Sequence, residues 1–281
     1  MPEGDTVYRA AHRLHAALAG KTLSGSDFRV PKWATTDLTG ATVDGVRSVG
    51  KHLFIDVSEA GGRTLSIHSH LMMDGAWHLY RHGEKWRKPG FTARVVLRAD
   101  DVEAVGFDLG ILELCRDPAA AVAHLGPDLL GPGWDADRAV ADLAADGDRP
   151  VGAALLDQRN LAGIGNIYRS ELCFLAGVHP LMPVRYVDLG AVVADAHRLL
   201  TANALTPVRC TTGDRRRGRE LWVYGRDHRP CRRCGSEIRR DRVGADPRGS
   251  AHERVIYFCP ACQPIRPGSD PAPGRTGTGG R

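Results

Sequence analysis

Four cysteines near the carboxyl end restrict the fold of this chain more than any other feature of its sequence. They form two pairs, Cys231-x2-Cys234 and Cys259-x2-Cys262, separated by 24 residues. Each pair can bend to place two thiolates on one ion, and four thiolates complete the tetrahedral shell of structural zinc. Such sites contribute roughly 10 kcal/mol or more, enough to order a small module. We therefore predict one structural Zn2+ per chain, rather than disulfides or a redox centre.

Length and hydropathy place the chain among soluble globular proteins. Its 281 residues suffice for one large domain or two modest ones with hydrophobic cores. No apolar run approaches the roughly 18 residues of a membrane span. Charged residues also interrupt the amino-terminal stretch where a secretory signal would be apolar. We therefore expect a cytoplasmic protein with no membrane partner.

The basic charge is concentrated near the cysteines. The net charge is +5, but residues 209–254 alone hold 14 arginines and 7 acidic residues, a surplus of seven. The planar guanidinium group suits phosphate, and a localised basic region favours a nucleic-acid partner. A GC-rich genome would also enrich arginine, so composition by itself leaves this interpretation open.

Hydrophobic patterning predicts an α+β fold. Residues 5–19 have apolar side chains at helical spacing before Gly20. From about residue 21 to 112 the pattern is typical of an antiparallel sandwich or barrel, with short β-prone segments at 42–49, 52–57, 64–68, 76–80 and 93–97. Helices are predicted at 119–125, 135–145, 151–159, 166–176 and 188–203, and further strands at 221–224 and 254–258.

These elements predict four regions. An N-terminal β-sandwich domain preceded by a helix occupies residues 1–118, and a helical domain occupies 119–220. The cysteine module follows at 221–263. Residues 264–281 are rich in Gly, Pro, Ser and Thr and are expected to form a disordered tail.

The amino terminus carries a candidate nucleophile. Removal of Met1, usual when a small residue follows, would leave Pro2 with a free secondary amine. An α-amino group titrates near pH 8, so a fraction is neutral and nucleophilic at pH 7. Attack on an aldehyde carbon gives an iminium that serves as an electron sink for elimination. Glu3 adds a carboxyl within reach of the same atom. Chance also explains a Met-Pro start, so this hypothesis depends on the rest of the chain.

A glycine-rich turn is a candidate anion site. Gly163 and Gly165 precede Asn166, where a helix is predicted to begin. Glycine permits positive φ and close approach of the backbone to a ligand, and the N–H groups of a helix N-terminus can face a phosphate. A tight turn packed for its own sake explains the same residues.

Two other turns are weaker candidates. Lys51 follows Gly50 at the start of an apolar strand, where a surface lysine without a function is the alternative. Met73 lies in the turn after His70; an exposed methionine can wedge between bases, whereas a core position is the alternative. His68 and His70 alternate as on a strand, and two histidines alone are weak support for a metal site.

Together these motifs resemble the formamidopyrimidine-DNA glycosylase/endonuclease VIII family of DNA repair enzymes. They occur in the family's order: a Pro-Glu-Gly start, a Gly-Lys turn, the sequence Ala-Gly-Ile-Gly-Asn at 162–166, and the paired cysteines followed by Gln263. The start from Pro2 to Val7 is closer to the endonuclease VIII branch and looks like its actinobacterial second form.

The resemblance implies both a fold and a chemistry. A β-sandwich and a helix–two-turn–helix domain with a zinc finger would hold DNA in the cleft between them. The protein would be a bifunctional DNA glycosylase/AP lyase of base excision repair that removes oxidised bases, mainly pyrimidines. Pro2 would attack C1′ of the damaged nucleotide, and Glu3 would transfer protons. Strand cleavage would follow by β/δ-elimination.

The same resemblance implies the DNA contacts. Lys51 matches a lysine that contacts phosphate and assists base loss. Asn166 and Arg254 match residues that pinch the phosphates flanking the lesion, and we count Arg254 and Lys51 with the catalytic set. Met73 matches a methionine that the formamidopyrimidine branch inserts into the helix.

Two departures from the family pattern bear on the substrate. Thr6 replaces a second acidic residue that many members carry, and the Arg-Phe pair inserted by the formamidopyrimidine branch has no match in residues 105–110. We therefore expect a relative preference for bubbles, forks or single strands over fully paired duplex. Separately, we expect a monomer that acts on damaged DNA of the bacterial nucleoid. The alternatives are a catalytically inactive DNA-binding module of the same fold and a zinc-ribbon interaction protein, although the latter leaves the β-rich half unexplained.

Overall fold

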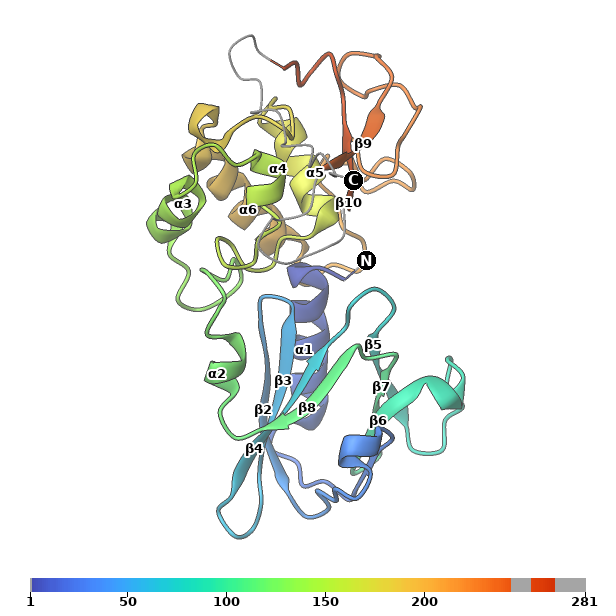
Figure 1. Ribbon diagram of the computed structural model, residues 1–281. Helices are drawn as coiled ribbons and strands as arrows, with labels where there is room; N and C mark the ends of the chain where they lie inside the picture. Colours follow the sequence, from blue (N-terminus) through green and yellow to red (C-terminus); the bar gives the residue numbers. More distant parts are fainter. Residues whose placement is uncertain (1, 244–253, 266–281) are drawn as a thin grey trace, which may run out of the picture.

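The computed structural model describes residues 2–243 and 254–265. Figure 1 shows two lobes, with the helical one above the sheet-containing one. The sheet lobe contains the first helix and eight strands, and the helical lobe contains the later helices and the C-terminal cysteine module. The expected α+β architecture is confirmed.

The sheet lobe is a sandwich of two antiparallel four-stranded sheets. One sheet has the order β1-β6-β7-β5 and the other β2-β3-β4-β8. The strands are β1 (Gly25–Phe28), β2 (Thr42–Val49), β3 (His52–Ser58), β4 (Thr64–His70), β5 (Ala76–Arg81), β6 (Ala93–Ala99), β7 (Val102–Phe107) and β8 (Ile111–Cys115). Short 3-10 turns lie at η1 (Pro31–Trp33) and η2 (Gly90–Thr92).

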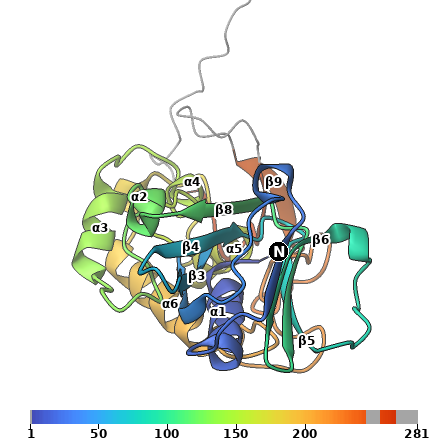
Figure 2. The same ribbon diagram turned by 90° about the horizontal axis from the view of Figure 1, so that it is seen from below.

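Helix α1 (Gly4–Leu18) confirms the prediction for residues 5–19. Val7, Ala11, Leu14 and Leu18 are buried at intervals of three to four residues, so one face of the helix enters the core. That core contains residues of both sheets. Seen from below, α1 lies between the β2–β3–β4–β8 sheet and β5 (Figure 2). The packing fixes where the amino terminus meets the helical lobe.

The helical lobe has its own apolar core. Its elements, with the connecting helix α2, are α2 (Pro118–Val122), α3 (Ala136–Ala144), α4 (Val151–Ala154), α5 (Asn166–Leu175), η3 (Val184–Tyr186) and α6 (Leu189–Asn203). The helix predicted at 151–159 is wrong beyond Ala154. Asp157 there accepts the N–H of Arg159 and pairs with Arg149 and Arg159, a local arrangement that competes with helix formation.

The C-terminal module contains a two-stranded ribbon, β9 (Arg239–Val243) and β10 (Arg254–Phe258). The strand predicted at 254–258 is confirmed, and the one at 221–224 is wrong. The N–H groups of residues 222–224 donate to the carboxylate of Glu171 instead of a neighbouring strand. Of the predicted tail, residues 266–281 lie outside the described residues. No helix in the described ranges is long and apolar enough to cross a membrane.

Candidate active site

The first residues of the chain pack against the glycine turn that precedes α5. The N–H of Gly4 donates to the carbonyl of Gly163 at 2.9 Å. A Cβ on Gly4 would lie 2.9 Å from the Cα of Gly163, too close for any larger residue to be accepted without a shift. Gly163 itself has φ of +108°, a region that favours glycine. Gly4 and Gly163 are 159 positions apart in the sequence, and their two motifs form one site.

Glu3 is fully buried, and its carboxylate lies on the N-terminus of α5. It accepts hydrogen bonds from the backbone N–H groups of Gly165 at 2.9 Å, Ile167 at 2.7 Å and Tyr168 at 3.2 Å. These are N–H groups that a helix leaves without internal partners, and the helix dipole favours an anion there. A Cβ on Gly165 would approach the Glu3 carboxyl carbon to 2.4 Å, so this position requires glycine.

The expected phosphate position at this turn needs a correction. The N–H groups do bind an anion, but the anion is the protein's own carboxylate, that of Glu3. The turn therefore positions Glu3 directly after Pro2, which is partly exposed at the junction of the two lobes. The sequence indicated both Glu3 and the glycine turn as site candidates, but not that they bind each other.

A buried ion pair joins the first turn of α1 to the chain beyond α6. Arg209 binds both carboxylate oxygens of Asp5, donates to the hydroxyl of Thr6 at 3.1 Å, and lies 3.9 Å from the Glu3 carboxylate. Its guanidinium also lies over the ring of Tyr168, whose hydroxyl donates to Asp5 at 3.0 Å. Burial, followed by the Asp5 charge, raises the pKa of Tyr168, so it remains a neutral donor. Asp5 belonged to the start motif from Pro2 to Val7, but no sequence pattern assigned Asp5 or Arg209 a role in the site.

Lys51 lies in a turn that packs on the same glycine segment. Gly50 has φ of +56°, and its N–H donates to Asp128 at 2.9 Å. A Cβ on Gly50 would lie 3.1 Å from that of Ala162 and 3.5 Å from the nitrogen of Gly163. Lys51 is half-buried beside this contact. The Gly-Lys turn, the amino terminus and the turn before α5 thus meet at one place.

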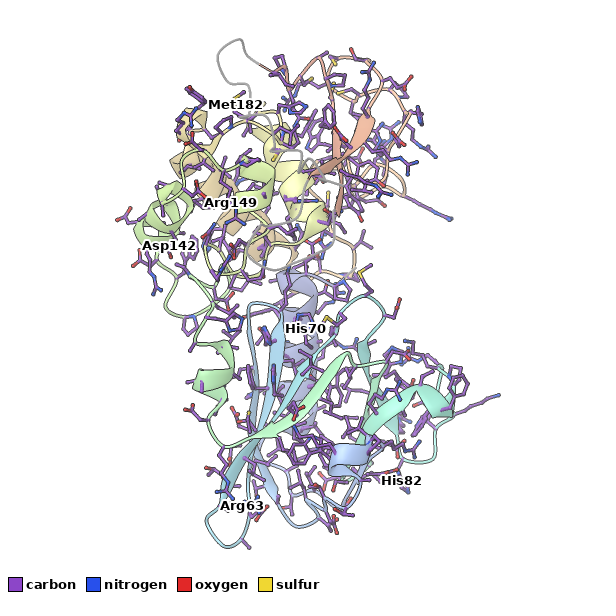
Figure 3. The ribbon with its side chains drawn as sticks, viewed as in Figure 1. Arg63, His70, His82, Asp142, Arg149 and Met182 are labelled. Carbon is purple, nitrogen blue, oxygen red and sulfur yellow. The ribbon has the colours of Figure 1, made fainter. Side chains whose placement is uncertain are left out.

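Lys51 lies beside a cluster of histidines. The His52 ring stacks with His68 and packs edge-on against His70, with centroids 5.0 Å apart in both cases, and His124 lies 6.1 Å away. Burial, with the neighbouring histidines and Lys51, lowers the pKa of His52 to about 3. Burial and then Lys51 lower the pKa of His70 to about 4. These rings are therefore neutral at pH 7, and His70 lies at the end of β4 that faces the helical lobe (Figure 3).

The turn after His70 presents two methionines to solvent. Met72 and Met73 are 47% and 57% exposed, so the alternative that they are core residues is wrong. Met72 has φ of +51°, and its N–H donates to Nδ1 of His70 at 3.0 Å. The turn thereby displays apolar side chains next to the histidines.

Asn166 connects α5 to the cysteine module. The side chain is 5% exposed; its Nδ2 donates to the carbonyl of Val255 at 2.7 Å, and its Oδ1 accepts from Arg169 at 2.8 Å. Arg254 precedes Val255 on β10, with its backbone opposite Val243. The side chain of Arg254 lies outside the described part of the structure. A DNA contact through Nδ2 of Asn166 would compete with its bond to Val255.

The four cysteines converge as their spacing predicts. Their sulfur atoms all lie within 4.8 Å of one another, with 3.9 Å between Cys231 and Cys262 and 3.5 Å between Cys234 and Cys259. A tetrahedron with Zn–S bonds of about 2.3 Å has edges of about 3.8 Å, so the cluster is compatible with a metal. In the described ranges it is the one group of three or more His, Cys, Asp or Glu that could hold an ion. The buried Gln263 braces it by accepting from the N–H of Cys259 at 2.8 Å.

The two lobes and the cysteine module define the architecture of a DNA repair family. The formamidopyrimidine-DNA glycosylase N-terminal domain matches residues 1–108, and the formamidopyrimidine-DNA glycosylase H2TH domain matches residues 125–204. The chain belongs to the formamidopyrimidine-DNA glycosylase/endonuclease VIII family, as its motifs predicted.

Individual relatives agree with the predicted branch. The chain is 52% identical to the probable endonuclease 8 2 of Streptomyces coelicolor, covering 99% of this chain and 98% of the relative. It is also 52% identical to the DNA-(apurinic or apyrimidinic site) lyase Nei2 of Mycolicibacterium smegmatis, covering 94% and 99%. A Lactococcus lactis formamidopyrimidine-DNA glycosylase, crystallised with DNA containing an AP site, shares the fold at 23% identity with a TM-score of 0.74, covering 94% and 100%.

Proposed function

We propose that this protein is a bifunctional DNA glycosylase/AP lyase of base excision repair, which removes oxidised bases, mainly pyrimidines. The observation that carries the proposal is the fixed position of Glu3 beside Pro2, supported by the relatives named as endonuclease 8 and AP lyase. The buried carboxylate also caps α5, so it would serve an inactive module as well, and the test of the proposal therefore concerns the amine of Pro2.

The chemistry follows from that pair. The neutral amine of Pro2 attacks C1′, and the bond between C1′ and the base breaks with its electron pair leaving on the base. Glu3 passes the proton lost by the attacking nitrogen to O4′, so the C1′–O4′ bond breaks with its electron pair on that oxygen, which opens the sugar ring and leaves an iminium. The iminium acidifies the C2′ proton, and loss of that proton expels the 3′ phosphate by β-elimination; δ-elimination then releases the 5′ phosphate. Glu3 opens the sugar ring and returns protons during turnover. Its three backbone hydrogen bonds keep it in place throughout.

The junction of the lobes supplies the DNA contacts in this proposal. Lys51 binds a phosphate and assists base loss, Asn166 and Arg254 hold the phosphates that flank the lesion, and Met73 enters the stack. Phosphate contacts provide affinity without sequence preference and make binding salt-dependent. A structural Zn2+ on the four cysteines orders the ribbon that carries Arg254.

The test is borohydride trapping on an oligonucleotide with an abasic site or an oxidised pyrimidine. We expect a covalent adduct with the wild-type protein, because borohydride reduces the iminium to a stable amine. Pro2→Gly, or retention of Met1 behind a tag, should abolish the adduct and leave DNA affinity within about twofold. Intact DNA binding with no wild-type adduct on any lesion would instead identify a binding module.

We also propose a preference for bubbles, forks or single strands. Thr6 replaces an acidic residue of the family and is engaged by Arg209, and residues 105–110 lack an inserted Arg-Phe pair to fill the gap left by an everted base. Eversion costs a few kcal/mol in paired duplex and less in single strands. Cleavage rates on one lesion in bubble and matched duplex check this; equal or faster cleavage of the duplex contradicts it.

The remaining expectations follow from this role. We propose a cytoplasmic monomer acting on the bacterial nucleoid, with domain limits at 1–118, 119–220 and 221–263. Sedimentation with and without DNA measures the oligomeric state. Limited proteolysis locates the domain boundaries.

A further inference from the structure

In the sheet lobe, hydrogen bonds connect the loop between β5 and β6 to two turns, the methionine turn after β4 and the turn between β7 and β8. Lys88 belongs to the β5–β6 loop, which we define as residues 82–92. Its ammonium donates to the carbonyl of Asp74 at 3.0 Å and pairs with Asp108 at 2.7 Å. Asp74 follows the exposed methionines, and Asp108 lies in the turn between β7 and β8. The β5–β6 loop therefore continues the surface of the methionine turn.

The loop is held in place by its own contacts. Trp86 donates its indole N–H to Glu103 at 2.6 Å and packs edge-on against Phe107, with centroids 5.6 Å apart. The backbone N–H of Arg87 donates to the hydroxyl of Tyr80 at 3.1 Å. The segment is held by the side chains of Trp86 and Lys88 and by the backbone of Arg87. It therefore presents its other side chains, including that of Arg87, in a defined arrangement, which lowers the entropy lost on binding.

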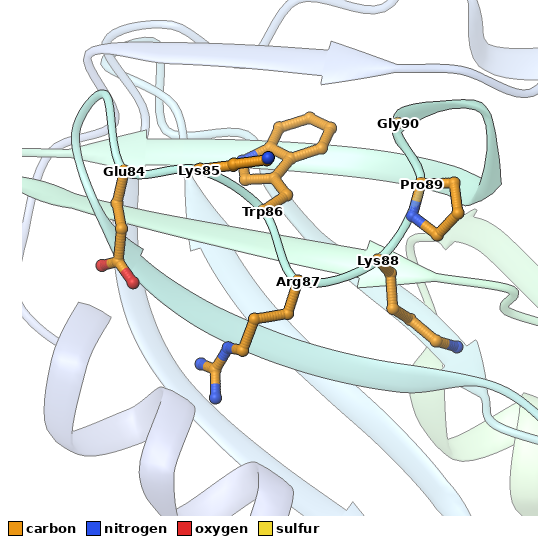
Figure 4. Close-up of a pocket in the computed structure, with 7 residues that line it drawn as sticks. All are labelled: Glu84, Lys85, Trp86, Arg87, Lys88, Pro89 and Gly90. Atoms are coloured by element: carbon orange, nitrogen blue, oxygen red, sulfur yellow. The ribbon is translucent and has the colours of Figure 1, made fainter.

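These other side chains combine an aromatic ring with cations. Phe91 is 83% exposed, more than any other large hydrophobic residue described. Lys85 and Arg87 are exposed as well, and Lys85 has no ion-pair partner within the described ranges. Residues 84–90 line an open hollow of about 540 Å3 (Figure 4). The loop therefore presents an exposed aromatic ring and exposed positive charge on one segment.

We propose that the β5–β6 loop binds single-stranded DNA flanking the lesion, with a base stacked on Phe91 and phosphates on Lys85 and Arg87. The proposal rests on the proposed function, which places the adjoining Met73 turn on DNA. Aromatic rings and cations are the two components of sequence-independent single-strand sites. The positive charge complements a phosphate backbone, and an exposed ring stacks only on a base that is not already paired and stacked. Duplex DNA and an acidic protein surface are the competing occupants.

The aromatic part is tested with two single strands that share a central tetrahydrofuran abasic analogue, one of about 30 nucleotides and one of about 9. We expect Phe91→Ala to weaken binding of the long strand about tenfold and leave the short one unchanged. Phe91→Tyr keeps the ring and should keep the affinity. Tyr186→Ala, which removes a 51% exposed aromatic from the helical lobe, is the matched control. The proposal would be overturned if Phe91→Ala bound both strands with wild-type affinity. It would also be overturned if Phe91→Ala lost as much affinity for a long matched duplex as for the long single strand.

The cationic part is tested by salt dependence. Each lost phosphate contact lowers the slope of log K against log salt by about 0.7 for a single strand. Lys85→Ala should show this reduction on the long strand. Arg63→Ala removes the same charge at the far end of the sheet lobe and should leave the slope unchanged (Figure 3). An unchanged slope for Lys85→Ala would overturn this part.

Borohydride trapping on the short strand separates the two proposals. Phe91→Ala should form as much adduct as wild type, since the ring lies outside the reacting site. Loss of that adduct would contradict a role confined to the flanking strand. If wild type forms no adduct, the proposed function fails, whereas the binding comparison still reports on the loop.

Discussion

At the scale of single residues, Glu3 has two structural roles. Its backbone begins α1 as the N-cap, and its side chain takes the place of an N-cap for α5. Gly165, the formal N-cap of α5, has no side chain with which to bind the free N–H groups. One carboxylate therefore holds Glu3 in the candidate active site and accepts hydrogen bonds from the buried N–H groups of α5. A substitution that displaces it will affect both the chemistry and the stability of the helix.

Gly165→Ala tests this coupling. The added methyl would lie 2.4 to 2.7 Å from the Glu3 carboxyl group, so the carboxylate must leave the helix end. We expect a loss of about 1–3 kcal/mol in unfolding free energy, because buried N–H groups become unsatisfied, and at least a tenfold slower adduct formation.

Chemical denaturation and single-turnover trapping measure the two effects. Gly133→Ala is the matched control, since a Cβ there meets nothing within 4 Å. Normal trapping by Gly165→Ala would show that Glu3 need not be held at this position.

At the scale of elements, α5 is the centre of the helical lobe. Glu3 binds its first turn, Asn166 binds Val255 on β10, and Glu171 binds the backbone of residues 222–224. Phe174 packs in the small core of the cysteine module. The helix thus connects the amino terminus to the metal module, and ordering the module also completes the hydrogen bonds of α5.

Metal removal should unfold the cysteine module and spare the sheet lobe. Structural zinc supplies roughly 10 kcal/mol or more to such modules, whereas the sandwich has a separate core. A strong chelator, or Cys259→Ser, should release one equivalent of zinc and weaken DNA binding at least tenfold. Metal analysis and hydrogen exchange check both statements; unchanged protection of β9 and β10 after metal loss would contradict them.

At the scale of the whole molecule, the histidines around Lys51 make stability depend on pH. The native pKa values of His52 and His70, about 3 and 4, lie below the unfolded value of about 6.5. Between these limits the unfolded chain binds more protons than the native one, so unfolding free energy falls as pH is lowered from 6.5 towards 4.

Denaturation at a series of pH values measures this slope. His52→Leu should make it shallower, because the variant removes one group that is neutral only in the folded state. His82→Leu, at an exposed histidine remote from the lobe junction (Figure 3), is the control and should keep the wild-type slope. An unaltered slope in His52→Leu would rule out this origin.

The sequence by itself determined the features that depend on neighbours in the chain. Cysteine spacing predicted the metal cluster, apolar spacing predicted α1, and alternation predicted the strands of the sandwich. Each of these patterns involves residues that are near one another in the sequence. It can therefore be recognised without knowledge of the tertiary structure. The ordered motifs also predicted the family.

Only the tertiary structure decided which groups satisfy one another across the chain. The carboxylate of Glu3 binds N–H groups 162 to 165 residues away in the sequence. Arg209 forms an ion pair with Asp5, 204 residues away. Residues 222–224 have a β-prone sequence, but Glu171 takes their N–H groups and no strand forms. A buried polar group needs a hydrogen-bond partner, but the sequence does not show which group that partner is. The packing of the two lobes determines it.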